Sequence, residues 1–191
     1  TTSGNMIFPL SSKAYLRLNG SATNAGNYET GSGIKPLTEY STTDYTAILG
    51  TLLSDGSKLE FNYTNNRQDK VGYPGLTMDI VYSYTDMYTL KYHRVTPFGM
   101  FSTMNVELFN TDIDHLMNNV VLRGNTGNGV MSWPTASDTY GGRIIGTIGS
   151  DIRAGIDYEH NTKDAEQNMV MSGMNVFMTY LWPGVETEKL G

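Results

Sequence analysis

Apolar and polar residues alternate along several segments of about ten residues, and the connections between these segments are alternately short and long. Between Lys58 and Asn66, for example, Leu59, Phe61 and Tyr63 alternate with polar or charged neighbours. A period of two residues is typical of β-strands, and no window shows apolar residues recurring at the helical period of about 3.6. The pattern therefore predicts an all-β chain.

The alternation predicts eight strands. Their ranges are Lys13–Asn19, Tyr45–Leu53, Lys58–Asn66, Ile80–Arg94, Phe101–Asn110, Tyr140–Gly149, Ile152–His160 and Val170–Trp182. Short connections alternate with long polar ones along this series. The short ones are 54–57, 95–100 and 150–151, and the long ones are 20–43, 67–79, 111–137 and 161–170. Short turns on one side, long loops on the other and strands apolar on one face are typical of transmembrane antiparallel β-barrels.

In such a barrel the short turns are periplasmic, the long loops are external, and the two faces of each strand differ. Apolar residues are expected to point outward to lipid: Leu59, Phe61, Tyr63, Leu90, Tyr92, Val106, Leu108, Ile156 and Met178. Polar residues are expected to point into a wet lumen: Glu60, Asn62, Lys91, Asn105, Glu107, Arg153 and Asp157. A soluble β-sandwich, as in an adhesin or a phage fibre, also alternates and remains an alternative.

Composition narrows the classes of protein. The 191 residues are 39% hydrophobic with 13 Tyr and 21 Gly, which fits a β-rich chain with a wet inner face. No apolar run approaches the length of a transmembrane helix. The absence of cysteine excludes disulfides and Cys-based zinc sites within these residues. A net charge of −6 without a basic patch argues against nucleic-acid binding. The chain starts without a signal peptide and is expected to be a piece of a longer protein.

No catalytic constellation is visible, so we expect no enzyme. The strongest chemical feature is the pair His115 and Met117, which share a face if this segment is extended. Imidazole and thioether are ligands that suit copper, the thioether especially Cu(I). A turn centred near residues 96–97 would also bring Met78 opposite His115 at the external end. Met78 reaches the lumen only if the loop at Pro74-Gly75 breaks the alternation.

Three segments resemble the barrel of TonB-dependent copper receptors of the bacterial outer membrane. They are Tyr73–Asp79, Asp112–Asn118 and Met131…Ala136–Gly142, and the resemblance spans roughly residues 40–160. It implies a 22-stranded barrel around a plug domain. The family's His-x-Met ligand pair maps onto His115 and Met117, and a Cys-x-x-x-Met pair from the plug completes the site. The chain departs from the family at Thr77, where Pro is usual, and at Asn118, where Asp is usual.

The resemblance implies that residues 1–191 are part of the barrel domain of an outer-membrane transporter for copper, with Cu(I) as cargo. Its partners would be its own plug domain, which these residues lack, a TonB-type energy-coupling protein and outer-membrane lipid. Met169 and Met171 could help to capture copper at the entrance, whereas Met174 and Met178 are expected to face lipid.

Eight strands are too few to enclose a plug, so we expect an open, curved sheet whose first and last predicted strands lack partners. Two alternatives stay open beside the sandwich. One is a TonB-dependent receptor for a ferric siderophore or cobalamin. The other is a complete eight-stranded barrel with a structural or adhesive role, in which the first and last strands would pair.

Overall fold

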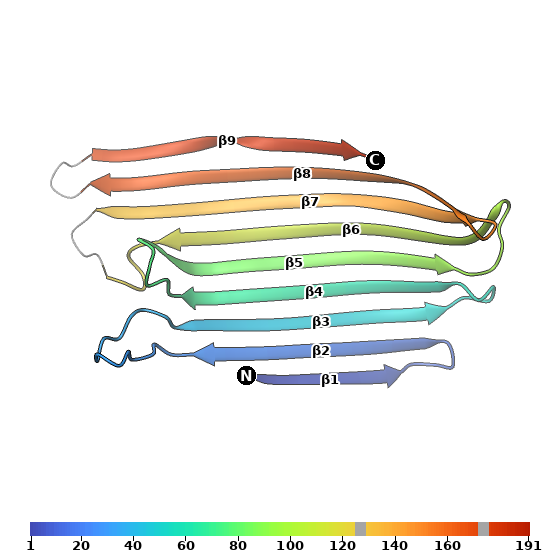
Figure 1. Ribbon diagram of the computed structural model, residues 1–191, viewed down its shortest axis with the longest axis horizontal. Helices are drawn as coiled ribbons and strands as arrows, with labels where there is room; N and C mark the ends of the chain where they lie inside the picture. The colour runs from blue at the N-terminus through green and yellow to red at the C-terminus, as the bar shows by residue number, and fades with distance from the viewer. Residues whose placement is uncertain (125–128, 172–175) are drawn as a thin grey trace.

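Nine antiparallel strands form one sheet in the computed structural model, which describes residues 1–124, 129–171 and 176–191 (Figure 1). The strands are β1 (Thr2–Pro9), β2 (Ala14–Ala25), β3 (Tyr40–Leu52), β4 (Lys58–Val71), β5 (Asp79–Arg94), β6 (Phe101–Asn118), β7 (Val130–Ile148), β8 (Ile152–Met171) and β9 (Val176–Leu190). Each strand pairs with its neighbours in the sequence, so the sheet is an up-and-down meander. The described residues contain no helix long and apolar enough to cross a membrane.

The connections sort to the two ends of the strands as the sequence predicts (Figure 1). At one end, here named the turn end, lie the short connections at 10–13, 53–57, 95–100 and 149–151. At the other, the loop end, lie the connections at 26–39 and 72–78 and the described parts of the connection between β6 and β7, residues 119–124 and 129. The tight turn after β3 depends on Gly56, whose φ of 82° is left-handed and is readily adopted by glycine.

Direct strand pairing places the predicted outward residues on one face of the sheet, with one exception. Residues that pair across strands share a face, and one row of such pairs is Leu16, Leu49, Phe61, Leu90 and Leu108. A neighbouring row on the opposite face is charged and contains Glu60, Lys91, Glu107, Arg143 and Asp157. Glu107 lies 3.8 Å from Lys91 and 3.2 Å from Arg143 in this row. We name the two sides the apolar face and the polar face.

The exception is Met178, which was expected to face lipid. Met178 pairs with Met169, and Met169 lies on the polar face together with Asp157. The pairing register of β8 and β9 shifts by one residue between Lys163 and Ala165, and this shift exchanges the faces of β9. Pro183, which lies in the shifted part of β9, has no backbone N–H to donate to a regular ladder.

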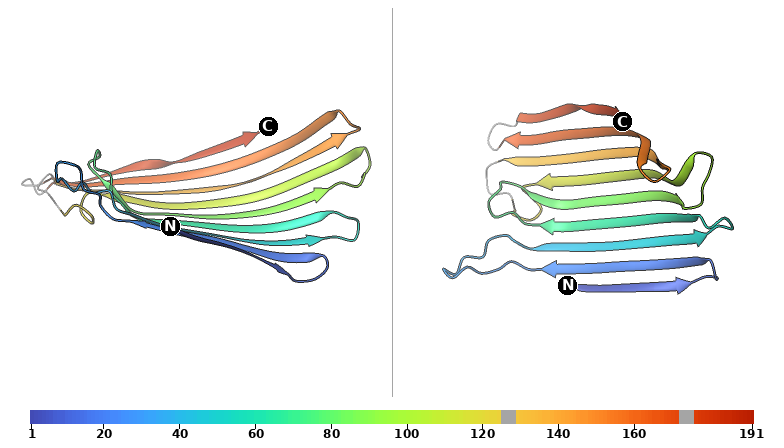
Figure 2. Two further views of the ribbon diagram at one scale, coloured as in Figure 1. Left: turned by 60° about the horizontal axis from the view of Figure 1, so that its bottom comes forward. Right: turned by 45° about the vertical axis from the view of Figure 1, so that its right-hand side comes forward.

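The sheet curves and twists, and it is not closed (Figure 2). Among the described residues β1 pairs only with β2, and β9 pairs only with β8. Large apolar side chains stay exposed, and within the described residues only Met78 and Ile80 are buried apolar side chains. In the part of the chain that the structure describes, this single layer has neither the second sheet nor the dry core of a β-sandwich, and its edges do not pair as in a complete small barrel.

The number and length of the strands differ from the prediction. Nine strands replace the predicted eight, because Thr2–Pro9 also forms a strand, so the predicted first strand does have a partner. The predicted loops at 111–137 and 161–170 are largely or wholly strand. The predicted strand Val170–Trp182 instead contains the end of β8 and the start of β9, with residues 172–175 outside the described residues.

Candidate functional site

His115 and Met117 lie near the loop end of β6, on the polar face. Glu107 has the same parity on β6, so all three side chains leave the sheet on one side. His115 is paired with Ser83 of β5 and Thr135 of β7, and its Nδ1 is hydrogen-bonded to Thr135 Oγ1 at 3.2 Å. Both His115 and Met117 are half-buried. His115 and Met117 therefore share the polar face, with Cα atoms roughly 7 Å apart along the strand.

Met78 directly precedes β5 and is buried, with 9% of its surface exposed. It does not lie opposite His115 as the predicted register required. Asp79 pairs with Asn118 and His115 pairs with Ser83, which places Met78 several residues beyond His115. The hairpin of β5 and β6 turns at Phe98–Phe101 rather than at 96–97, because Gly99 with a φ of 58° forms its tip. Met78 instead lies nearer to Met117 than to His115, because the next residue, Asp79, pairs with Asn118.

The alternation is broken inside β5 and not by the loop at Pro74-Gly75. Ile80 pairs with Met117, and the register then shifts so that Tyr82 pairs with Leu116. One extra residue in β5 therefore places Ile80 on the polar face, although the other even-numbered residues of β5 lie on the apolar face. Met78 lies two residues before Ile80 and just outside β5, and an extended backbone there would direct both side chains to the polar face.

Asp79, whose side chain is buried next to Met78, forms an ion pair with the half-buried Arg123, which the sequence did not reveal. The carboxylate of Asp79 accepts hydrogen bonds from Arg123 Nε at 2.6 Å and Nη2 at 2.7 Å. These hydrogen bonds raise the pKa of Arg123, so the guanidinium stays charged. Arg123 lies in a polar connection far along the chain, and no local sequence signal links it to Asp79.

Two asparagines shape the connection after β6. Asn118 Oδ1 accepts the backbone N–H groups of Val120 and Val121 at 3.1 and 3.0 Å, so its side chain holds the first turn. Asn119 is buried, donates to the Gly129 carbonyl at 2.9 Å and accepts the Met131 N–H at 2.9 Å. The departure from Asp at position 118 therefore leaves a residue that still caps the turn through its oxygen.

A row of three methionines continues the polar face beyond Met117. Met131 of β7 pairs with Met169 of β8, and Met169 pairs with Met178 of β9. Met131 lies diagonally from Met117, because Met117 pairs with Trp133 two residues away on β7. Of these three, the sequence indicated only Met169 as a residue that captures copper. Met178 was missed because the bulge that turns it to this face is a feature of the backbone. The side chain of Met171 lies outside the described residues.

The donors in this region are one imidazole and several thioethers. Among the described residues no group of three or more His, Cys, Asp and Glu side chains is placed to hold a metal ion. A site here would therefore depend on sulfur and imidazole donors, which favour soft ions such as Cu(I).

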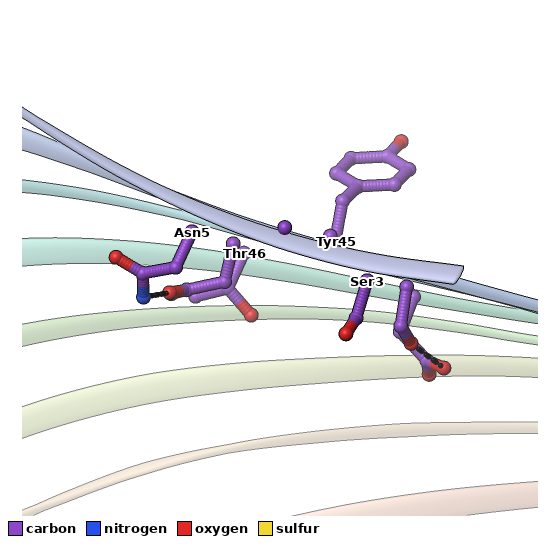
Figure 3. Close-up of a pocket in the computed structure, with 9 residues that line it drawn as sticks. Ser3, Asn5, Tyr45 and Thr46 are labelled. Atoms are coloured by element: carbon purple, nitrogen blue, oxygen red, sulfur yellow. Dashed lines mark hydrogen bonds between the residues drawn. The ribbon is translucent and has the colours of Figure 1, made fainter. Parts of the chain in front are cut away.

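A separate, open depression of about 410 Å³ lies across β1, β2 and β3. Ser3, Asn5 and Thr46 point to one side of the sheet there, whereas Tyr45 points to the other (Figure 3). None of the predicted metal ligands lines this depression. It illustrates the two faces of the sheet and is not part of the candidate site.

Comparison with known proteins identifies a similar fold. No protein-family model matches the chain, and no curated protein matches it in sequence. A solved structure described as "Copper transporter OprC" superposes with a TM-score of 0.80 at 18% sequence identity. The match covers 96% of this chain and 29% of that chain, so these residues span less than a third of the similar protein. At this identity the likeness shows the fold alone, a curved antiparallel sheet like part of that transporter.

Proposed function

We propose that these residues form part of the barrel wall of an outer-membrane, TonB-dependent transporter for copper. The apolar face would contact lipid, the polar face would line the lumen, and the loop end would be external. Such a protein moves its cargo and catalyses no reaction. The likeness to a copper transporter supports this assignment, and the resemblance of Tyr73–Asp79 and Asp112–Asn118 to copper-receptor motifs supports it independently.

The observation that carries the proposal is the placement of His115 and Met117 on one face, beside further thioethers. Met78, directly before β5, would be a third soft donor, and the row Met131, Met169 and Met178 would extend the sulfur-lined surface. Cu(I) prefers such donors, whereas Zn(II) and Fe(III) prefer imidazole with thiolate or oxygen. The lumen-side ligands are incomplete alone and would accept further soft ligands from a plug domain. A TonB-type protein would supply the energy.

The test replaces the two central ligands in the complete protein that contains these residues. We expect His115→Ala with Met117→Leu to remove a tightly bound Cu(I), measured by competition with a chromophoric Cu(I) chelator. The matched control is His93→Ala with Met87→Leu, because both residues lie on the polar face of β5 away from the site. Undiminished copper binding after replacement of His115, Met117 and Met78 would show that these residues do not form the copper site. Uptake of a ferric siderophore or cobalamin by the same protein would then favour that class of receptor.

A further inference from the structure

A fully buried carboxylate, that of Asp79, ties together the backbone and side chains around Met78. Arg123 binds both oxygens of this carboxylate, and the backbone N–H of Tyr73 donates to it at 2.8 Å. Arg123 also donates to the carbonyl oxygen of Tyr73. We name this arrangement the Asp79–Arg123 clamp. Every oxygen of the buried carboxylate thus has a donor, so its burial is compensated.

The clamp joins connections that are far apart in the sequence. Tyr73 belongs to the connection between β4 and β5, whereas Arg123 belongs to the connection between β6 and β7, 44 residues from Asp79. A third connection joins the same cluster, because Gly72 donates its N–H to the carbonyl of Glu39 at 2.9 Å. A Cβ at Gly72 would lie 2.7 Å from Leu37, so glycine permits this close approach. Three connections of the loop end are therefore packed together.

The clamp differs from the other ion pairs in its burial and its geometry. The Asp79 side chain is 1% exposed, whereas Lys35 and Glu29, paired in a neighbouring connection, are 69% and 55% exposed. A two-point hydrogen bond between guanidinium and carboxylate fixes orientation as well as distance. An exposed ion pair such as Lys35 with Glu29 does little to fix the orientation or the distance of its two partners. The clamp is thus suited to hold one backbone position firmly.

The backbone position that the clamp holds is that of Asp79, directly after Met78. Methionine has three rotatable side-chain bonds and loses conformational entropy when its sulfur is fixed on a metal. Fixing the Cα position and burying the side chain before the metal arrives reduces this cost. Met78 is buried although it lies at the rim of a single-layer sheet, and the clamp and its packed connections flank it.

We propose that Asp79 and Arg123 are positioning residues that hold the thioether of Met78 ready to bind the soft metal ion. The proposal rests on the proposed function, since it assigns Met78 to the same site as His115 and Met117. Neither Asp79 nor Arg123 touches the metal. They act through the backbone at Met78, as supporting residues do around metal ligands in general.

The experiment measures the affinity of the complete protein, carrying R123Q, M78L or both, for Ag(I), which is a redox-stable soft ion. We expect R123Q to weaken Ag(I) affinity roughly tenfold, within the range known for residues that support metal ligands. M78L should weaken it by a similar factor, and the double variant should be no weaker than M78L alone. X-ray absorption should count one sulfur fewer on the metal in R123Q, as in M78L. R94Q is the matched control, because it removes the same side chain from a pair with Asp55 at the turn end.

Each other outcome is decisive. A lower melting temperature for R123Q with unchanged affinity and sulfur count would make the clamp purely structural and overturn the proposal. Additive losses in the double variant would also overturn it, because Arg123 would then act independently of Met78. If replacing His115 and Met117 also leaves the Ag(I) affinity unchanged, the proposed function fails and the positioning role fails with it. Should R123Q not assemble, D79N repeats the test with a side chain of the same shape.

Discussion

Ile80 of β5 pairs directly with Met117 of β6, one step before the register of these strands shifts. The even-numbered residues of β5 that follow the shift, such as Leu90, lie on the apolar face, whereas Ile80 lies opposite Met117 on the polar face. One inserted residue, Val81, therefore decides which side of the sheet the start of β5 presents. Bulges commonly re-aim side chains in this way beside functional sites.

Cross-linking tests the bulge. We expect cysteines at Ile80 and Met117 to form a disulfide under mild oxidation, because directly paired residues have Cβ atoms roughly 4.5–5.5 Å apart. Cysteines at Val81 and Met117 should not, because Val81 is displaced from the pair by the bulge. These 191 residues contain no cysteine, so the new pair is the only one within them. Mass spectrometry of the oxidised protein identifies the bond, and efficient cross-linking of Val81 instead of Ile80 would contradict the register.

The assignment of the apolar face to lipid makes a prediction about charge. Leu90 lies in the row of leucines and Phe61 on this face, and Leu90→Lys should lower the free energy of unfolding in a bilayer by about 2–4 kcal/mol. Thr89→Lys is the matched control, because Thr89 is next in the chain and lies on the polar face. Denaturant unfolding in lipid measures both variants. Equal losses for the two would show that the faces do not differ in their solvent.

Gly50 permits a close contact on the polar face. The ring of Tyr15 crosses over Gly50, and its hydroxyl donates to Glu60 on the next strand. A Cβ at Gly50 would lie 2.3 Å from the Tyr15 ring, so Gly50→Ala should displace the ring and lower the free energy of unfolding by about 1–3 kcal/mol. Gly20→Ala is the control, since its Cβ would meet its nearest atom at 3.7 Å. An equally large loss of unfolding free energy in Gly20→Ala would show that the effect comes from the backbone and not from displacement of the Tyr15 ring.

Alternation predicted the strands well where one face is apolar, as in β4 and β5. It failed at 111–118 and 161–170, where the strands continue toward the loop end with polar residues on both faces. A strand that extends beyond an apolar belt needs no alternation, so its sequence is indistinguishable from a polar loop. His115 and Met117 lie in such an extension, and their shared face followed from the period of two alone.

The register and the supporting contacts could not be predicted. The hairpin of β5 and β6 turns near Gly99, and placing its centre near 96–97 displaced every predicted pair by about five residues. The bulge at Ile80 has no sequence signature, although it decides the face of Ile80, two residues after Met78. The contact between Asp79 and Arg123 joins distant residues of two connections, which no periodicity reveals.

The methionine row gives the last prediction. Met131, Met169 and Met178 are paired in succession on the polar face, and we expect their thioethers to form a surface on which soft ions bind before reaching His115 and Met117. We expect replacement of all three by leucine to remove the weaker phase of Ag(I) binding, measured by calorimetry, and to leave the tight phase unchanged. Leucine keeps the apolar volume and removes only sulfur. The matched control replaces Met6, Met100 and Met104, which lie outside this row, and should keep both phases. Loss of the weak phase in the control, or its survival without the row, would show that these three residues do not capture the ion.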